Sequence, residues 1–237
     1  MKSDSVIVEI KNLKKIFGSV RAVDVKNLTL NKGEIVGLVG NNGAGKTTLM
    51  RLMLDLIEAN SGSVCVAGMD VSKTEEWKSM VGAYLDSSFL IEFYTAKEYL
   101  EFVCDAYSIE KSLQNEAIGQ FKTFFGDEAL FENKYIRDLS AGNKQKVGIA
   151  SAIISHPDVI ILDEPFNYLD PTSQVMANKI LKKEAERGAL VLVSTHNLAH
   201  VTDLCTRVLL MEKSEIIKDL SNENSVAEKT LSEYFNI

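Results

Sequence analysis

The segment Gly40 to Thr47 reads GNNGAGKT and matches the pattern G-x-x-x-x-G-K-[ST] at every fixed position. The apolar run Glu34 to Val39 precedes it, and a helical pattern begins near Gly45. A strand, a glycine-rich loop and a helix in this order form the structure that wraps phosphate groups. The glycines let successive N–H groups turn toward one anion, and the helix N-terminus adds its positive end. The segment therefore predicts a nucleotide-binding α/β domain of the P-loop NTPase (RecA-like) class.

Two side chains of this loop have predicted chemical roles. The ammonium group of Lys46 can reach the β- and γ-phosphates of a nucleotide, and the hydroxyl of Thr47 can hold Mg²⁺. The predicted nucleotide-binding residues are Gly40, Asn41, Asn42, Gly43, Ala44, Gly45, Lys46, Thr47 and Thr48.

The carboxylates that such a loop requires are found in the segment VIILDEP, Val159 to Pro165. Its four apolar residues predict a buried strand, and Asp163 stands at the carboxyl end, where α/β sheets bind their ligands. We expect Asp163 to hold Mg²⁺, directly or through water. Glu164 is one residue further on and is the predicted general base for the attacking water.

The rest of the chain alternates between strand and helix patterns. Expected strands are 6–10, 22–30, 80–85, 159–162 and 190–194, with a closing hairpin at 207–211 and 215–218; helical patterns cover 95–155 and 173–187. This order predicts one α/β domain over residues 1–237, with a mostly parallel sheet, an N-terminal antiparallel β layer and an inserted helical subdomain. Residues 1–86 and 158–237 form the predicted core lobe, and residues 87–157 form the helical lobe.

Charge and hydropathy limit the possible partners. The formal net charge is −7 and charges of both signs are interspersed, which argues against non-specific nucleic-acid binding. No apolar run approaches the ~18 to 20 residues that span a bilayer, and the N-terminal residues lack the apolar segment of a secretory signal. Three cysteines without a CxxC pair are typical of a reduced, intracellular protein. The expected location is therefore the cytoplasm, unless a partner holds the chain at a membrane.

A third motif, Leu139 to Asn143, reads LSAGN, precedes a helical pattern and lies upstream of Asp163. It resembles the LSGGQ signature of the ATP-binding cassette (ABC) family, and the resemblance extends over essentially the whole chain. The resemblance implies a transporter subunit that binds and hydrolyses ATP with Mg²⁺. It also implies a head-to-tail dimer, in which each ATP lies between one chain's phosphate loop and the partner's signature. The residues implied to act across that interface are Ser140, Ala141, Gly142 and Asn143.

Further positions match motifs of the same family. Phe17, in KKIFG, stands where the family has an aromatic residue that stacks on adenine. Asp170, in NYLDP, matches the acid of the D-loop, and His196, in VSTHN, matches a histidine implied to contact the γ-phosphate. The predicted catalytic set is then Glu164, His196 and Lys46.

The chain departs from the family pattern at three positions. Ala141 and Asn143 replace a glycine and the final glutamine of the signature, but Ser140 and Gly142 remain. Asp86, in VGAYLD, aligns with the glutamine of the Gln-loop and is a predicted Mg²⁺ ligand through water. The alternative is that the true loop position lies one or two residues away from Asp86.

The apolar loop segment Phe89 to Tyr94 follows the Gln-loop position, and two interpretations remain open for it. In the family this region lines the groove that receives a transmembrane partner, and exposed apolar loop residues favour such an interface. Simple burial within the helical lobe is the other interpretation.

Two functions from different classes fit the resemblance. The first is the motor of a bacterial efflux-type transporter, a homodimer or a heterodimer with a second ABC subunit. It would be bound at the inner face of the cell membrane through a separate transmembrane permease. The alternative is a soluble non-transport ABC ATPase acting on ribosomes or nucleic acid, because EPFNYLDP with Asn167 is similar to the D-loop of that branch. A single phosphate loop, a single signature and the acidic balance favour transport, with no nucleic-acid partner expected.

Overall fold

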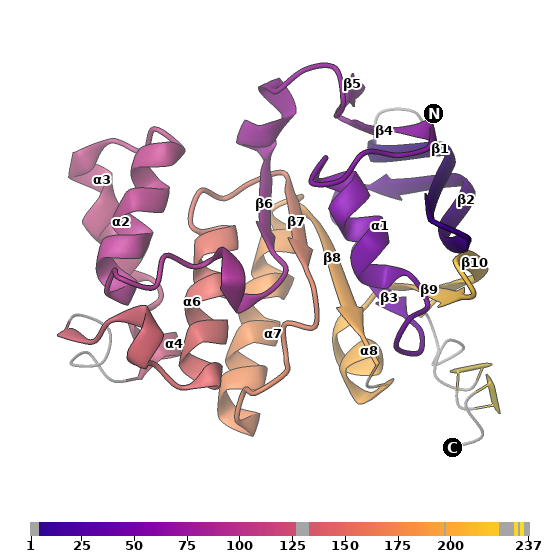
Figure 1. Ribbon diagram of the computed structural model, residues 1–237. Helices are drawn as coiled ribbons and strands as arrows, with labels where there is room; N and C mark the ends of the chain where they lie inside the picture. Colours follow the sequence, from indigo (N-terminus) through magenta and orange to yellow (C-terminus); the bar gives the residue numbers. More distant parts are fainter. Residues whose placement is uncertain (1–4, 127–132, 197, 223–229, 232, 235–237) are drawn as a thin grey trace.

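A computed structural model of the chain describes residues 5–126, 133–196, 198–222, 230–231 and 233–234 (Figure 1). Its strands are β1 (Val6–Phe17), β2 (Val20–Asn31), β3 (Ile35–Val39), β4 (Ser61–Val66), β5 (Met69–Asp70), β6 (Val81–Tyr84), β7 (Val159–Leu162), β8 (Leu190–Thr195), β9 (Arg207–Glu212) and β10 (Glu215–Ser221). Its helices are α1 (Lys46–Met53), α2 (Ala96–Ala106), α3 (Lys111–Gly119), α4 (Lys122–Phe125), α6 (Ala141–Ile153), α7 (Pro171–Glu186) and α8 (Leu198–Leu204). Three short 3₁₀ turns are η1 (Glu76–Met80), η2 (Ser87–Phe89) and η3 (Ile136–Asp138).

The strands form two sheets, with the orders β2-β1-β4-β5 and β10-β9-β3-β8-β7-β6. The first sheet is antiparallel. In the second sheet every pair from β9 to β6 is parallel, and β10 closes the edge as an antiparallel hairpin with β9. The predicted fold class is confirmed: a mostly parallel α/β sheet with an N-terminal antiparallel layer.

The central strands are buried on both faces, which explains why β7 and β8 are apolar without alternation. Ile160 and Leu162 of β7 pack into the core that contains α6, α7 and α8. Val159 and Ile161 pack on the opposite face, against α1 and the antiparallel sheet. Each of these strands therefore packs against a hydrophobic core on both faces. This packing fixes the positions of the carboxyl ends of β3, β8 and β7.

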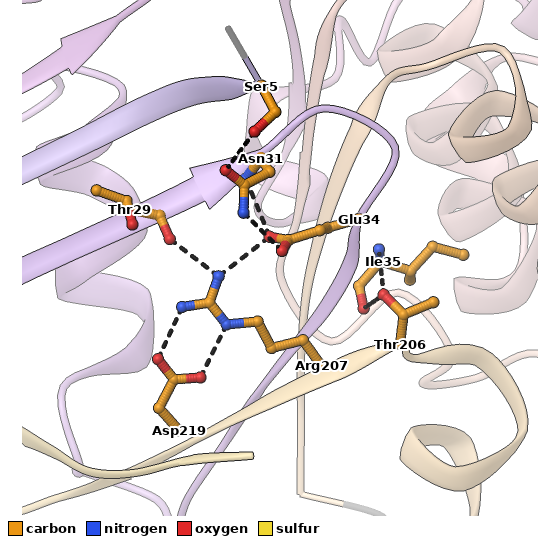
Figure 2. Close-up of polar contacts among 8 residues, drawn as sticks. All are labelled: Ser5, Thr29, Asn31, Glu34, Ile35, Thr206, Arg207 and Asp219. Carbon is orange, nitrogen blue, oxygen red and sulfur yellow. Dashed lines mark hydrogen bonds and ion pairs between the residues drawn. The ribbon is translucent and has the colours of Figure 1, made fainter. Parts of the chain in front are cut away.

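Arg207 on β9 ties the two sheets together at one end (Figure 2). Its guanidinium group donates to both carboxylate oxygens of Asp219 on β10, at 2.8 and 2.7 Å. It also donates to the carbonyl of Thr29 on β2 at 2.9 Å and to Glu34 at 3.1 Å. Glu34 in turn accepts hydrogen bonds from the backbone and side chain of Asn31, so the entry to β3 is fixed.

The helices α2 and α3 lie at the opposite end of the molecule from β1, β2 and β4 (Figure 1). Thr95 and Glu98 form a capping box at the start of α2, which is why this helix begins there. The long helix α6 packs on β6 and β7 and joins this end of the molecule to the sheet. In the part of the chain that the structure describes, no helix has both the length and the apolar character needed to cross a bilayer.

Candidate nucleotide-binding site

The predicted phosphate loop connects β3 to α1. Gly45 precedes α1 with a φ of 110°, a conformation that side-chain-bearing residues rarely adopt. The ammonium group of Lys46 is buried and donates to the carbonyls of Gly40 at 2.6 Å and Asn41 at 3.4 Å, so it spans the loop. A pocket of about 260 Å³ opens beside the loop. It is lined by Val20, Arg21, Ala22, the segment 42–48, Asp163 and Glu164.

Asp163 lies directly after β7 and faces the loop. Its Oδ2 accepts from the hydroxyl of Thr47 at 2.5 Å, and its Oδ1 accepts from the hydroxyl of Ser194 on β8. Among the described residues, no group of three or more His, Cys, Asp or Glu side chains could hold a metal by itself. One hydroxyl with one carboxylate nevertheless suits Mg²⁺, which binds through one or two carboxylates together with substrate phosphates and water. Thr47 and Asp163 therefore fit that ion.

Glu164 adopts a left-handed backbone conformation, with a φ of 47°. Its N–H donates to Ser194 Oγ at 2.8 Å, and its Oε2 lies 3.0 Å from Nδ1 of His196, just beyond β8. The order β3-β8-β7 thus brings together Lys46, Asp163, Glu164 and His196, four residues from three separate sequence motifs.

The signature segment forms the N-terminus of α6. The hydroxyl of Ser140 caps the helix by accepting from the N–H of Asn143 at 3.3 Å, and Ser140 and Ala141 are exposed. A Cβ at Gly142 would lie 2.6 Å from the carbonyl oxygen of Tyr168, so only glycine fits there. The described residues that line the phosphate-loop pocket include none from Leu139 to Asn143.

Asp170 begins the helix after the D-loop. Its carboxylate accepts from the N–H of Ser173 at 3.0 Å and from the Ser173 hydroxyl at 2.5 Å. The hydrogen bond from the Ser173 hydroxyl has the larger effect and that from the Ser173 N–H the smaller, and together they hold the pKa of Asp170 below its usual value. Asp170 is therefore a charged N-cap of α7 that fixes where the D-loop ends.

Asp86 follows β6 by two residues, at the same end of the sheet as Asp163. Its carboxylate caps η2 by accepting from the N–H of Ser88 at 2.8 Å, and it lies 4.0 Å from the guanidinium of Arg51 on α1. Both side chains of this ion pair are nearly half exposed. A second cavity, of about 420 Å³, is lined by Asp86, Asp163 and Glu164 together with Ala141, Lys144 and Gln145.

Phe17 ends β1 and is 50% exposed, with the ammonium of Lys15 at 4.9 Å from its ring centroid. It is not among the described residues that line the phosphate-loop pocket, although Val20, three residues further along the hairpin, is. The structure thus leaves the Phe17 ring on the surface near the site.

The apolar segment after Asp86 is divided between surface and core. Phe89 and Phe93 are exposed by 48% and 69%, whereas Leu90 is buried. Phe89 also lines an apolar hollow of about 310 Å³ together with Leu54, Leu56, Trp77, Lys78, Val81, Ala83, Leu85 and Tyr107. Simple burial therefore holds for Leu90, while the exposed Phe89 and Phe93 leave an interface as a prediction for this segment.

Sequence reasoning missed two side chains of the site. Ser194 binds both members of the Asp163-Glu164 pair, and Gln145 of α6 donates to the carbonyl of Glu164 at 3.2 Å. Ser194 had a recognisable signal, a hydroxyl at the end of a buried apolar strand two residues before His196. Gln145 had none, because its contact depends on how α6 packs against β6 and β7.

Comparison with known proteins identifies the family. Residues 23–167 match the family model described as ABC transporter. The uncharacterized ABC transporter ATP-binding protein YdbJ of Bacillus subtilis is 36% identical over 218 residues, which cover 91% of this chain and 69% of that protein. NatA of the same organism, an ABC transporter ATP-binding protein, is 34% identical over 206 residues, 86% of this chain and 82% of NatA. The methionine import ATP-binding protein MetN of Halalkalibacterium halodurans is 30% identical over 223 residues, 90% of this chain and 66% of MetN.

Solved structures share the fold. The ATP-binding subunit of an ABC transporter superposes with a TM-score of 0.84 at 25% identity, covering 97% of this chain and 93% of that one. A dimeric ATP-binding cassette bound to ADP and Pi gives a TM-score of 0.81 at 23% identity, covering 91% of this chain and 98% of that one. With the phosphate loop, the Asp163-Glu164 pair and the signature all in place, the chain belongs to the ABC transporter family as an ATP-binding subunit.

Proposed function

We propose that this chain hydrolyses ATP with Mg²⁺ and uses the reaction to drive a separate transmembrane permease. The observation that carries the proposal is the pocket in which Lys46 and Thr47 of the phosphate loop face Asp163 and Glu164. A phosphate group in such a pocket meets a cation, the N-terminus of a helix and a base in one place.

Each residue has a separate task in this proposal. Lys46 and the N–H groups of residues 43–48 bind the phosphates, and Thr47 and Asp163 hold Mg²⁺, with Asp86 as a further ligand through water. A bound Mg²⁺ supplies positive charge to the β- and γ-phosphates. Glu164 accepts a proton from the attacking water, and His196 orients that carboxylate and contacts the γ-phosphate.

We further propose that two chains close head to tail around ATP, as a homodimer or with a second ABC subunit. The exposed N-terminus of α6 supports this arrangement, because the backbone N–H groups of Ala141 and Gly142 and the hydroxyl of Ser140 can face the partner's nucleotide. Asn143 supports this arrangement by donating its N–H to the hydroxyl of Ser140, and Asp170 shapes the adjoining loop. Phe17 stacks on adenine from the β1–β2 hairpin.

The proposed membrane partner binds the apolar hollow between α1, β6 and η2. An exposed Phe89 beside Leu54 and Leu56 provides the apolar surface that a partner's helix would cover. The chain would then sit at the inner face of the cell membrane, and residues 87–157 would move as a lobe against residues 1–86 and 158–237. For the direction of transport we predict efflux. Relatives of the chain include proteins named for methionine import, so the direction needs its own test. Transport into sealed vesicles provides it.

Hydrolysis of Mg-ATP by the purified chain tests the proposal. We expect turnover that is lost in Lys46→Ala together with nucleotide binding, because a charge-assisted contact to the phosphates disappears. Lys73→Ala, which removes an exposed lysine paired with Asp70, is the matched control and should behave as the parent. A parent without ATP turnover, or a Lys46→Ala variant that binds Mg-ATP normally, would disprove the assignment.

A further inference from the structure

The backbone of Glu164 is held from both sides by groups outside its own motif. Its N–H donates to Ser194 Oγ at 2.8 Å, and its carbonyl accepts from Gln145 Nε2 and from the N–H of Asn167, both at 3.2 Å. Glu164 has a φ of 47°, and a left-handed conformation at a non-glycine residue costs about 1 to 3 kcal/mol unless its surroundings impose it. These contacts therefore hold the backbone of Glu164 in the left-handed conformation from which its side chain extends.

Gln145 is placed for this contact by its own neighbours. It is buried on α6, about one turn after the signature residue Ala141, and its Oε1 accepts from the hydroxyl of Tyr84 at 3.4 Å. Because that hydroxyl donates to the amide oxygen, the amide nitrogen is directed toward the carbonyl of Glu164. Burial, and secondarily the charge of Asp86, raises the pKa of Tyr84 above its usual value, so the hydroxyl keeps the proton that it donates.

Tyr84 is itself fixed by contact with α6. It ends β6, and a Cβ at Gly148 of α6 would lie 2.1 Å from its ring, so the ring packs directly on the helix backbone. The chain of contacts from Tyr84 through Gln145 to Glu164 thus joins β6, the helix that begins with the signature, and the loop that follows β7.

We propose that Gln145 is a positioning residue for ATP hydrolysis, whose amide holds the backbone of Glu164 in the conformation that directs its carboxylate at the phosphate-loop pocket. The proposal rests on the hydrolytic function argued above and deepens it. Gln145 sits on the same helix as Ser140, so it connects the signature to the general base within one chain.

Gln145→Met tests the proposal, because methionine has a similar shape and no donor. We expect kcat to fall about tenfold, as for one lost hydrogen bond that supports a reacting group, with the KM for ATP within about twofold. Gln114→Met is the matched control. Gln114 is also a buried helical glutamine and donates to a backbone carbonyl, that of Ile109 at 3.0 Å, but in the helical lobe. We expect Gln114→Met to lower the Tm and leave kcat unchanged.

A double-mutant comparison separates positioning from general destabilisation. In a Glu164→Gln background, single-turnover hydrolysis should not fall further when Gln145→Met is added, because the carboxylate that Gln145 positions is already gone. A further tenfold loss in that background, or an equal loss of kcat in Gln145→Met and Gln114→Met, would overturn the proposal.

Hydrogen exchange without nucleotide provides a readout that does not depend on hydrolysis. We expect faster amide exchange over residues 163–169 in Gln145→Met, including Asn167, and parental exchange there in Gln114→Met. Unchanged exchange over this segment in Gln145→Met would overturn the proposal. A parent chain without ATP turnover would disprove the proposed function, while the exchange result would still decide whether Gln145 holds Glu164.

Discussion

The Nδ1 atom of His196 lies 3.0 Å from Oε2 of Glu164, although the two residues follow different strands and stand 32 positions apart. The histidine side chain is 56% exposed and the glutamate 23%, so the pair is open to a ligand on one side. A ring nitrogen at this distance restricts the rotation of the carboxylate. Glu164 is therefore both accessible and oriented, as a general base must be.

Glu164→Gln preserves the shape of the side chain and removes the base. We expect turnover to fall about 10²- to 10⁴-fold while ATP binding is retained. Because hydrolysis reopens the proposed sandwich, the variant should accumulate as an ATP-bound dimer, which light scattering detects. Glu75→Gln, at an exposed surface position, is the control for the substitution itself. Near-normal turnover in Glu164→Gln would remove this residue from the role of base.

Ser140 should act on the partner's nucleotide. Ser140→Arg places a bulky cation at the exposed start of α6, so we expect loss of ATP-dependent dimerisation and of hydrolysis, with monomer nucleotide affinity unchanged. In a mixed dimer of one Ser140→Arg chain and one Lys46→Ala chain, both substitutions fall in the same nucleotide site. The other site keeps an intact phosphate loop and an intact signature. Residual activity in the mixture, absent from each pure variant, is the expected result. Ser112→Arg, also on an exposed helix surface, should retain full activity. Equal loss of nucleotide binding by the Ser140→Arg monomer would argue against a role in trans.

Asp86 should influence the requirement for Mg²⁺. If its carboxylate binds the ion through water, Asp86→Gln will leave hydrolysis within a few-fold and raise the Mg²⁺ concentration that gives half the maximal rate. Asp86→Ala should do the same and also weaken the start of η2, because the cap on the N–H of Ser88 is lost. Titration of Mg²⁺ at fixed ATP measures both effects.

Arg51→Gln is the control for Asp86, since it removes the neighbouring charge at 4.0 Å without removing the carboxylate. A Mg²⁺ midpoint that moves equally in Arg51→Gln and Asp86→Gln would assign the effect to the ion pair. An unchanged midpoint in both Asp86 variants would show that Asp86 is not a metal ligand.

Glu184 should make stability depend on pH. It is buried on α7, and its carboxylate contacts His156 Nδ1 and Arg187 Nε, each at 3.0 Å. Burial alone would raise its pKa, but the hydrogen bonds and charges of His156 and Arg187 outweigh burial and lower it below 4.5. A lowered folded-state pKa stabilises the protein above about pH 4.5, and that contribution is lost as the pH falls through the folded-state value.

Glu184→Gln should therefore reduce the free energy of unfolding at pH 7 by about 1 to 3 kcal/mol. The difference from the parent should narrow as the pH falls below 4.5. Denaturant unfolding at several pH values measures it, with the exposed Glu186→Gln on the same helix as control. A difference that does not change with pH would mean that the charge of Glu184 is not the source of its stabilisation.

The amino-acid sequence by itself determined the phosphate loop, the Asp163-Glu164 pair and the signature. Each is a contiguous motif whose chemistry follows from its own strand, turn or helix. The apolar runs of β7 and β8 likewise predicted buried strands, since a parallel sheet covered on both faces requires them.

Strand ends were less well predicted. Strand β1 continues to Phe17, well beyond the expected end at residue 10. Strand β2 spans Val20–Asn31, slightly longer than the expected 22–30. The cause is that Lys11, Lys14 and Lys15 interrupt the apolar alternation after Ile10, whereas cross-strand pairing with β2 maintains the strand as far as Phe17.

Tertiary structure alone decided how the motifs meet. The hydroxyl of Ser194 reaches Asp163 and Glu164 because β8 lies between β3 and β7, an order that the sequence does not state. Gln145 reaches Glu164 because α6 packs on β6 and β7. Such contacts join residues 19 to 31 positions apart in the chain. The local sequence around one of these residues does not predict its contact with the other. Local pattern can specify an element and its chemistry, but only the packing of elements brings a second group within hydrogen-bond distance.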